Sequence, residues 1–327
     1  MAKFKVVLLE DRYASHEHER KVLEKIGAQV IEGNKVRTAE DIVALCKDAD
    51  GITLNLGGLT AGVISKLEKC KVIARYGVGY DNVDTVAATK KGIMVANVPD
   101  YCLEDVSDQA FALFMACVRK TSIRDRQLRA GQWNIGRKDP MYRIAGKIFG
   151  LAGYGNIPKT LHRKLKGFNL ARVLVFDPFV PEDVIKAAGA EKADFDRLLK
   201  ESDFISCHVP LNDKTKHLFN KEAFSKMKKT AIFMNTSRGG LVDTRALYDA
   251  LKNKVINSAG IDVHEQEPVA KDYALFSLDN VVLSDHTGWY SEEAQVELQT
   301  KAAQAVADAL TGKIPGSVVN KDVLNKK

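Results

Sequence analysis

Three residues suited to anion binding and acid–base chemistry each follow an apolar stretch of the sequence. They are Arg238, Glu267 and His286. The apolar stretches, which we expect to be strands, are 231–234, 258–263 and 281–283. If these strands are parallel, their carboxyl ends meet at one edge of a sheet, where the three side chains can lie together. A guanidinium can bind a carboxylate, an imidazole can protonate a carbonyl oxygen, and a carboxylate can keep that imidazole charged. The set is sufficient for hydride transfer to a 2-oxo acid.

Other interpretations are open for single residues in these loops. His264 lies three residues before Glu267 and could act as the acid and base in place of His286. Glu267 could also be an ordinary surface acid that precedes a proline. His208, at the end of another expected strand, could be a packed and hydrogen-bonded core histidine rather than a ligand contact.

A glycine-rich turn between a strand and a helix predicts a cofactor site. The strand 147–152 runs into the turn 153–157, Gly-Tyr-Gly-Asn-Ile, and then into a helix. Glycine lets the backbone approach a pyrophosphate, and the helix N-terminus attracts its charge. Asp177 ends the next strand, where its carboxylate can bind a ribose diol and would repel a 2′-phosphate, so the pattern predicts NAD rather than NADP. Pro158 replaces the third glycine of the fingerprint, and proline is tolerated in the first turn of a helix.

Composition limits the class of protein. The 327 residues are 45% hydrophobic, which is enough for about two domains. No apolar run approaches the ~18 residues of a membrane span, and no signal-peptide core is present, so we expect a cytoplasmic protein without membrane contact. The five cysteines form no C-x-x-C pair and predict buried thiols rather than disulfides or a metal site. The net charge of +7 is spread along the chain, which favours general solubility over nucleic-acid binding.

Strands and helical stretches alternate along both halves of the chain, which predicts an α/β fold of two doubly wound parallel-sheet domains. In the first half we expect strands at 4–9, 28–31, 51–54, 71–74 and 93–96, with helices at 16–26, 39–47, 61–67 and 83–91. In the second half we expect strands at 147–152, 172–176, 203–207, 230–235, 257–263 and 281–284. The apolar helix 103–120 should be buried on several sides, between domains or at a subunit interface. The last helix, 291–310, should return to the first domain.

Two loops of the first half follow strands and precede helices, at 55–58 and 75–84. In the second loop the glycines at 77 and 79 expose backbone N–H groups that can hold a carboxylate. Alternatively, this loop is a simple turn in which Asp81 or Asn82 caps the next helix. His16 and His18 lie two residues apart on a polar helical stretch, so we expect them on the solvated surface rather than at a metal.

At these residues the sequence resembles the D-isomer-specific 2-hydroxyacid dehydrogenase family over almost its full length. The matching segments are 77–84, 153–157, 177–178, 208–211, 235–239, 241–243, 259–263, 267–268 and His286. The resemblance implies a flavodoxin-like substrate-binding domain formed by residues 1–100 and 290–327. It also implies a Rossmann NAD-binding domain formed by residues 101–289, through which two copies would join as a homodimer.

The resemblance also implies roles for individual residues. Arg238 would hold the substrate, and Glu267 would pair with His286, the acid and base. The substrate carboxylate would bind the backbone N–H groups of Gly77 and Val78. Leu56, Tyr101 and Trp289 would shape the substrate pocket. The implied cofactor contacts are Tyr154, Gly155, Asn156, Ile157, Asp177, His208, Val209, Pro210, Thr215, Thr236, Arg238, Asp262, His286 and Gly288.

The function expected from these features is NAD-dependent reduction of a small 2-oxo acid, such as glyoxylate, hydroxypyruvate or pyruvate, to the D-2-hydroxy acid. The segment 55–57 lacks the arginine that similar enzymes of phosphorylated three-carbon acids carry, and the chain ends soon after its last helix, so we do not expect phosphoglycerate. Glu267 in place of glutamine disfavours the formate dehydrogenase branch. Two alternatives are an NAD(H)-sensing, corepressor-like interaction protein, to whose branch Trp289 is similar, and a phosphite dehydrogenase.

Overall fold

A computed structural model describes residues 2–10, 12–33, 36, 38–55, 57–133 and 140–325. The chain divides into two compact units. The first unit comprises Met1–Cys102 and Ser291–Lys327, and the second comprises Leu103–Tyr290. From the sequence, the corresponding junctions are expected after residues 100 and 289. Each unit has its own sheet and its own hydrophobic core.

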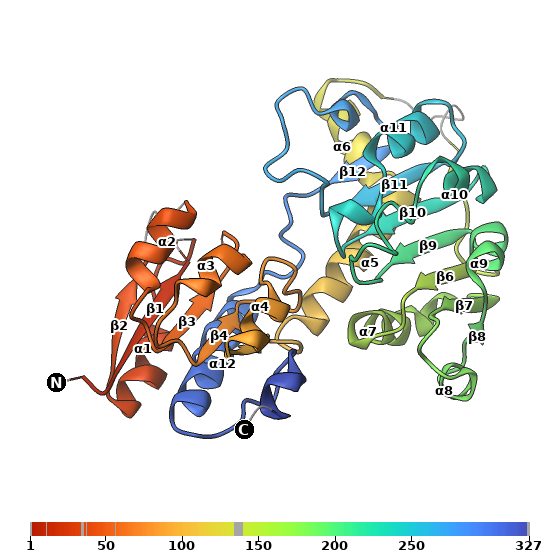
Figure 1. The fold of residues 1–327 in the computed structure, drawn as a ribbon. Coiled ribbons are helices and arrows are strands. Elements are labelled where there is room, and N and C mark those ends of the chain that lie inside the picture. The colour runs from red at the N-terminus through yellow and green to blue at the C-terminus, as the bar shows by residue number, and fades with distance from the viewer. Residues whose placement is uncertain are drawn as a thin grey trace. The chain divides into compact units, whose positions relative to one another are not determined.

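The first unit contains a five-stranded parallel sheet in the order β2-β1-β3-β4-β5. Its strands are β1 (Phe4–Leu9), β2 (Ala28–Glu32), β3 (Gly51–Leu54), β4 (Val72–Arg75) and β5 (Met94–Ala96). Its helices are α1 (Glu17–Leu23), α2 (Ala39–Cys46), α3 (Ala61–Ser65), α4 (Thr85–Lys90) and α12 (Glu292–Leu310). Helices α1 and α12 cover one face of this sheet, and α2, α3 and α4 cover the other (Figure 1). The strand order is that of flavodoxin-like folds, as expected.

The last long helix of the chain packs directly on this first sheet. All residues of β3 are buried, because helices cover both of its faces. A Cβ atom added to Gly51 of β3 would come within 2.7 Å of Cγ1 of Val306 in α12. The absence of a side chain at Gly51 therefore lets α12 approach the strand closely.

The expectation that His16 lies on the solvated surface is wrong. His16 is buried just before α1, and its ring nitrogens lie 3.0 Å from Glu19 and 3.2 Å from the carbonyl oxygen of Glu10. The charged residues around His16 are typical of a solvent-exposed helix. His16 instead contacts polar groups inside the first unit. His18 is partly exposed.

In the loop that follows β4, the residue that caps the next helix is neither Asp81 nor Asn82. The side chain of Asp84 is the N-cap of α4 and accepts the N–H of Ala87 at 2.8 Å. Asn82 instead donates its side-chain amide to the carbonyl oxygens of Asn55 and Gly57. The two glycine-containing loops of this unit are therefore tied to each other.

The second unit contains a seven-stranded parallel sheet in the order β12-β11-β10-β9-β6-β7-β8. Its strands are β6 (Ile148–Ala152), β7 (Arg172–Phe176), β8 (Glu191–Lys192), β9 (Phe204–Cys207), β10 (Ile232–Asn235), β11 (Ser258–Ile261) and β12 (Val281–Leu283). Its helices are α5 (Leu103–Arg119), α6 (Thr121–Arg129), α7 (Asn156–Leu165), α8 (Glu182–Ala187), α9 (Phe195–Glu201), α10 (Lys221–Lys226) and α11 (Thr244–Lys252). Counted from β6, this is the Rossmann order with one further strand at the edge, as predicted apart from β8. The strand β8 escapes prediction because its two residues are polar and show no apolar pattern.

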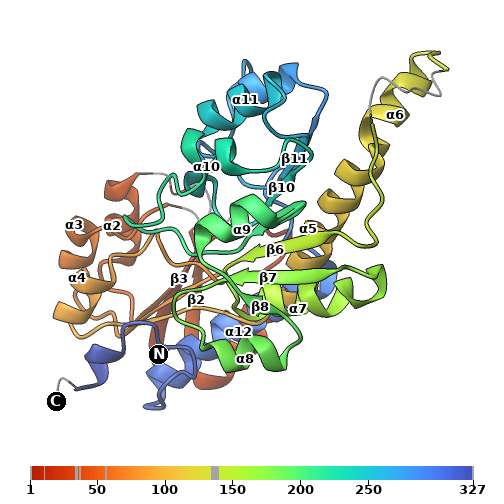
Figure 2. The same cartoon turned by 90° about the vertical axis from the view of Figure 1, so that its right-hand side faces the viewer.

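Helices cover both faces of this second sheet (Figure 2). Apolar residues of α9, α10 and α11 form one core with the sheet, and those of α5, α7 and α8 form another. Helix α5 is buried along one stripe that includes Leu113 and Phe114, whereas Ala112 on another side is exposed. The helix is thus less completely enclosed within the single chain than its composition suggests. Among the described residues, no helix combines the length and the apolar character needed to cross a membrane.

Candidate active site

The structure brings Glu267 and His286 into direct contact. The Nδ1 atom of His286 lies 2.7 Å from Oε2 of Glu267. The other carboxylate oxygen, Oε1, accepts the backbone N–H of His264 at 2.8 Å. Partial burial tends to raise the pKa of the Glu267 carboxyl, but the hydrogen bonds from His286 and His264 outweigh it and hold that pKa below its ordinary value. Glu267 is therefore a carboxylate at neutral pH, so His286 donates from Nδ1 and its Nε2 is left for substrate chemistry.

Asp262 holds the backbone that carries His286. His286 has a φ of 59°, a left-handed conformation that is uncommon for a residue other than glycine. Its N–H donates to the carbonyl oxygen of Asp262 at 2.8 Å. The N–H groups of Thr287 and Gly288 donate to the two carboxylate oxygens of Asp262 at 3.2 and 3.1 Å. Asp262 is almost completely buried, so these bonds fix the turn that carries the His286 side chain.

Two polar residues that we did not single out from the sequence complete this support. The hydroxyl of Ser284 donates to Oδ1 of Asp262 at 2.7 Å, and Gln109 of α5 donates to the Ser284 hydroxyl at 2.8 Å. Gly288 lies so close that a Cβ there would be 2.7 Å from Asp262 and 3.0 Å from Gln109. The sequence signal for this contact is Gln109, a polar residue within the apolar helix α5. A polar side chain on a buried helix needs a hydrogen-bond partner.

Arg238 lies at the same edge of the sheet, in the loop that follows the neighbouring strand β10. The strands β10, β11 and β12 are adjacent, and Arg238, Glu267 and His286 follow them in that order. The carbonyl oxygen of Arg238 accepts the side-chain amide of Asn235 at 2.9 Å. A Cβ on Gly239 would lie 1.9 Å from the carbonyl oxygen of His264, so the turn after Arg238 packs directly on the loop that leads to Glu267.

His264, the alternative acid and base, uses both ring nitrogens inside the protein. Its Nε2 lies 2.8 Å from the carbonyl oxygen of Ser284, and its Nδ1 lies 3.2 Å from the hydroxyl of Tyr273. Its ring also packs edge-on against Tyr273, with 5.4 Å between the ring centres. These contacts give His264 a role in holding its loop, which leaves His286 as the better candidate for proton transfer.

The glycine-rich turn lies where the Rossmann sheet reverses its strand order, between β6 and β9. Gly153 has a φ of 94°, and a Cβ there would lie 2.7 Å from the carbonyl oxygen of His208 after β9. Gly155 is the N-cap of α7, and a Cβ there would meet no heavy atom within 4 Å. The backbone around Gly155 is thus open, and the N–H groups of Asn156 and Ile157 begin the helix. Pro158 is buried in the first turn, where proline is expected to be tolerated.

Asp177 joins the end of β7 to the glycine-rich turn. Its Oδ2 accepts the N–H of Tyr154 at 2.8 Å. Its Oδ1 accepts the N–H groups of Phe179 and Val180 at 2.8 and 3.2 Å. The carboxylate is thereby held in place next to the turn, with its remaining lone pair available to a ribose hydroxyl.

The other expected cofactor contacts lie on the loops after β9 and β10. His208 contacts the Ser206 hydroxyl through Nε2 at 2.8 Å, and burial lowers the pKa of His208 to about 3, so its ring is neutral. Val209 accepts the Ser237 hydroxyl at its carbonyl oxygen, at 2.8 Å. Pro210 accepts the Thr215 hydroxyl at 2.6 Å, which closes the exposed turn that Thr215 occupies. Trp289 is partly buried and packs edge-on against Tyr290.

The expected carboxylate-binding residues Gly77 and Val78 belong to the first unit. Their carbonyl oxygens accept the N–H of Val98 at 3.0 Å and the side-chain amide of Asn97 at 2.7 Å. Neither of their own N–H groups donates to another described residue. Leu56, the other expected substrate contact here, is outside the described residues.

Arg75 is a residue of this loop to which the sequence analysis assigned no role. Gly77 has a φ of 131°, and the space that a Cβ would occupy is filled by the Arg75 guanidinium, 1.8 Å from Nη1. The available signal was a basic residue at the end of a buried strand, directly before a glycine-rich loop. Positive charge thus lies beside the backbone N–H groups of the loop.

Two observations in the second unit fit a dinucleotide. The open backbone at Gly155 lies at the N-terminus of α7, a suitable place for a pyrophosphate. The hydroxyl of Thr236, after β10, is buried, and among the described residues it has no hydrogen-bond partner. A buried hydroxyl without a partner is costly, and the polar groups at the nicotinamide end of NAD are suitable partners.

Comparisons with known proteins identify the family of this chain. Residues 111–288 match the family model for the NAD binding domain of D-isomer specific 2-hydroxyacid dehydrogenases. The chain is 40% identical to the glyoxylate reductase of Korarchaeum cryptofilum over 287 residues, which cover 86% of each chain. It is 39% identical to the D-3-phosphoglycerate dehydrogenase of Methanocaldococcus jannaschii over 307 residues, 93% of this chain and 58% of that one. The structure of Aquifex aeolicus D-lactate dehydrogenase, complexed with NAD and lactic acid, matches with a TM-score of 0.85 and 26% identity, covering 96% of this chain and 99% of that one.

The fold and the site define an NAD-dependent oxidoreductase. The chain belongs to the D-isomer specific 2-hydroxyacid dehydrogenase family, and its activity is the interconversion of a 2-oxo acid and a D-2-hydroxy acid. The family, the α/β fold class and NAD as cofactor, all predicted from the sequence, are confirmed.

Proposed function

We propose that this enzyme reduces a small unphosphorylated 2-oxo acid, such as glyoxylate, hydroxypyruvate or pyruvate. The observation that carries the proposal is the hydrogen bond between His286 and Glu267, at the sheet edge that Arg238 shares. Likeness to known proteins does not choose the acid, since the glyoxylate reductase and the phosphoglycerate dehydrogenase are 40% and 39% identical to this chain. The preference for an unphosphorylated acid rests on the segment 55–57, which contains no arginine or lysine.

Each part of the substrate has a proposed partner. The Arg238 guanidinium of the second unit is proposed to bind the substrate carboxylate or carbonyl oxygen. The N–H groups of Gly77 and Val78 in the first unit are proposed to bind a substrate carboxylate. NADH, once bound, would supply the hydride that reduces the carbonyl carbon. His286 would give a proton from Nε2 to the carbonyl oxygen, and Glu267 would stabilise the charged imidazole before that transfer. In the opposite direction the neutral ring of His286 takes the proton from the hydroxyl group.

The second unit is proposed to bind NAD, and the first the substrate. The N-terminus of α7 would hold the pyrophosphate through Gly155, Asn156 and Ile157. Asp177 would accept hydrogen bonds from the adenosine ribose. The remaining proposed contacts with NAD are Tyr154, His208, Val209, Pro210, Thr215, Thr236, Arg238, Asp262, His286 and Gly288. For Asp262 this role would be additional to its support of the His286 turn.

A panel of 2-oxo acids tests the proposal. NADH absorbance should fall when one of the small unphosphorylated acids is added, and His286→Ala should abolish the loss while NADH fluorescence still reports binding. Faster turnover of a phosphorylated acid would contradict the choice of substrate. No turnover with any acid, together with dimerisation that depends on NADH, would instead support a nucleotide-sensing role.

We also propose a cytoplasmic homodimer joined through the second unit. Exposed apolar side chains lie on and after α6, namely Leu128, Trp133, Met141 and Tyr142. Trp133 is 80% exposed, and large exposed apolar side chains close together in the chain are typical of subunit interfaces. The five cysteines are free thiols, which suits a reducing compartment. Light scattering should report a dimer, and Trp133→Glu should shift it towards the monomer.

A further inference from the structure

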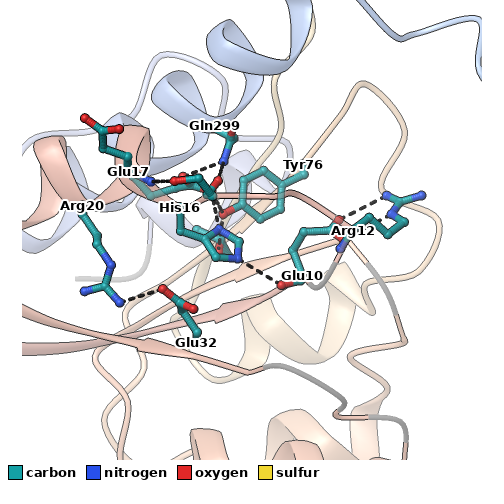
Figure 3. Close-up of polar contacts among 11 residues, drawn as sticks. Glu10, Arg12, His16, Glu17, Arg20, Glu32, Tyr76 and Gln299 are labelled. Carbon is teal, nitrogen blue, oxygen red and sulfur yellow. Dashed lines mark hydrogen bonds and ion pairs between the residues drawn. The ribbon is translucent and has the colours of Figure 1, made fainter. Parts of the chain in front are cut away.

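A buried carboxylate in the first unit lies at the centre of a polar network that ends at the glycine loop. Glu19 of α1 accepts the Tyr76 hydroxyl at Oε1 and the Gln299 side-chain amide at Oε2, both at 2.8 Å. The ring of His16 lies 3.0 Å from Oε1, and the Thr53 hydroxyl donates to the Tyr76 hydroxyl at 2.9 Å. Figure 3 shows His16, Tyr76 and Gln299 converging on this point.

The side chains of this network are buried. Glu19, Thr53 and Gln299 are 0% exposed, and Tyr76 is 1% exposed. A buried carboxylate is costly unless donors surround it, and here a phenol, an amide and an imidazole do so. The hydrogen bond with Glu19 raises the pKa of His16, which burial alone would lower. The carboxylate of Glu19 therefore lies beside the His16 ring, whose protonated state is favoured.

Tyr76 connects this network to the substrate loop, because it directly precedes Gly77. Its own N–H donates to the carbonyl oxygen of Leu54 at 2.8 Å, so both its backbone and its phenol are held. On the far side, the loop is held by Val98, whose N–H donates to the Gly77 carbonyl oxygen at 3.0 Å. The backbone from the Tyr76 N–H to the Gly77 carbonyl oxygen is thus held at both ends, and Gly77 between them has a φ of 131°.

We propose that Glu19 is a positioning residue for the substrate carboxylate. By holding the Tyr76 phenol, it fixes the direction of the Gly77 and Val78 N–H groups, and so sets substrate affinity without touching the substrate. The inference rests on the proposed function of these two N–H groups. Gln299 of α12 also donates to Glu19, so side chains from both helices on this face of the sheet meet at the carboxylate that accepts the Tyr76 hydroxyl.

Two variants weaken the network at different points. Tyr76→Phe removes one hydroxyl, and Glu19→Gln keeps the shape of the side chain but places an amide where donors already point. Both should raise KM for the 2-oxo acid about tenfold, as expected for lost binding in both ground and transition state, with kcat changed less than about threefold. The Kd for NADH should not change, because its proposed contacts lie in the second unit.

Asn320→Asp provides the matched control. Asn320 is buried in the same unit, where its side chain accepts the Val95 N–H at 2.8 Å and donates to the Ile93 carbonyl oxygen at 2.9 Å. The exchange disturbs a buried amide but does not touch the glycine loop. It should lower Tm without raising KM, which separates positioning from a general loss of stability.

Amide hydrogen exchange gives a readout that does not require turnover. In the two network variants the Gly77 and Val78 amides should exchange roughly tenfold faster than in the parent protein, and in Asn320→Asp they should not. Oxamate, a carboxylate that is not reduced, should slow exchange of these two amides in the parent protein and slow it less in the variants.

The outcomes distinguish the inference from the proposed function. Unchanged KM and unchanged exchange in a folded Tyr76→Phe protein would overturn the positioning role, even if Glu19→Gln does not fold. A parent protein that neither reduces a 2-oxo acid nor protects the two amides with oxamate would overturn the proposed function of the loop. In that case faster exchange in the variants would still show that Glu19 holds the loop.

Discussion

Glu267 holds His286 through one carboxylate oxygen while its other oxygen is held by the backbone of His264. The carboxylate is therefore fixed to the loop after β11, and the direction of the imidazole is fixed with it. Because Asp262 holds the His286 backbone separately, the ring is constrained at both ends. Such double support suits the proton transfer proposed for His286, since it sets the direction of the ring before substrate binds.

Removing the charge of Glu267 should slow catalysis. Glu267→Gln leaves a hydrogen-bond acceptor but no negative charge to stabilise the charged imidazole of His286, so reduction should fall by about a hundredfold. The measurement is kcat for 2-oxo acid reduction.

Glu265→Gln is the control for this change. Glu265 lies two residues away and contacts His217 at 2.5 Å and the N–H of Thr244 at 3.2 Å, so it tests loop stability without contacting His286. Its kcat should stay close to that of the parent enzyme. An unchanged kcat in Glu267→Gln would rule out the role assigned to Glu267.

The two glycines of the cofactor turn should respond differently to alanine. Gly153→Ala places a Cβ 2.7 Å from the His208 backbone at a φ of 94°, and should cost about 2 kcal/mol or more of the free energy of unfolding. Gly155→Ala meets no atom within 4 Å, so the fold should keep its stability while the Kd for NADH rises about tenfold. Denaturant unfolding and fluorescence titration measure the two effects. Equal NADH affinity in Gly155→Ala and the parent would contradict a pyrophosphate site there.

Asp177 should determine the choice between NADH and NADPH. Asp177→Ala removes the charge that would repel a 2′-phosphate, so the ratio of kcat/KM for NADH to that for NADPH should fall at least about tenfold. Because Asp177 also accepts three backbone N–H groups, Asp177→Asn is the companion variant that removes the charge but keeps one of the two acceptor oxygens. If neither variant changes the ratio, Asp177 only holds the turn.

His16 and His208 should give the two units opposite responses to pH. The raised pKa of His16 means that its contribution to stability is complete below its ordinary value of 6.5 and is lost as the pH rises through the raised value. The pKa of His208 is lowered to about 3, so its contribution is complete above 6.5 and declines as the pH falls towards 3.

Hydrogen exchange measured separately for peptides of each unit checks this response. His16→Gln should flatten the alkaline loss in the first unit, and His208→Asn should flatten the acid loss in the second. The same pH dependence in each variant and the parent would show that other groups control stability.

Much of the second unit could be predicted because its determinants are local. Each of Arg238, Glu267 and His286 follows its own apolar strand, and parallel strands deliver their carboxyl ends to one edge whatever lies between them. The glycine-rich turn and Asp177 are likewise recognised from their positions after strands. The edge strand β8 was missed because the pairing of its backbone with β7, rather than any apolar pattern, makes it a strand.

The sequence by itself determined the alternation of strands and helices and the glycine-rich turn, since each depends on spacing within a short segment. Only the tertiary structure decided which polar residues are buried. Glu19 lies in a stretch of charged residues, and its partners Tyr76 and Gln299 are 57 and 280 positions away along the chain. Whether a carboxylate is exposed or enclosed depends on what the folded chain places around it, and no local pattern encodes contacts at such separations.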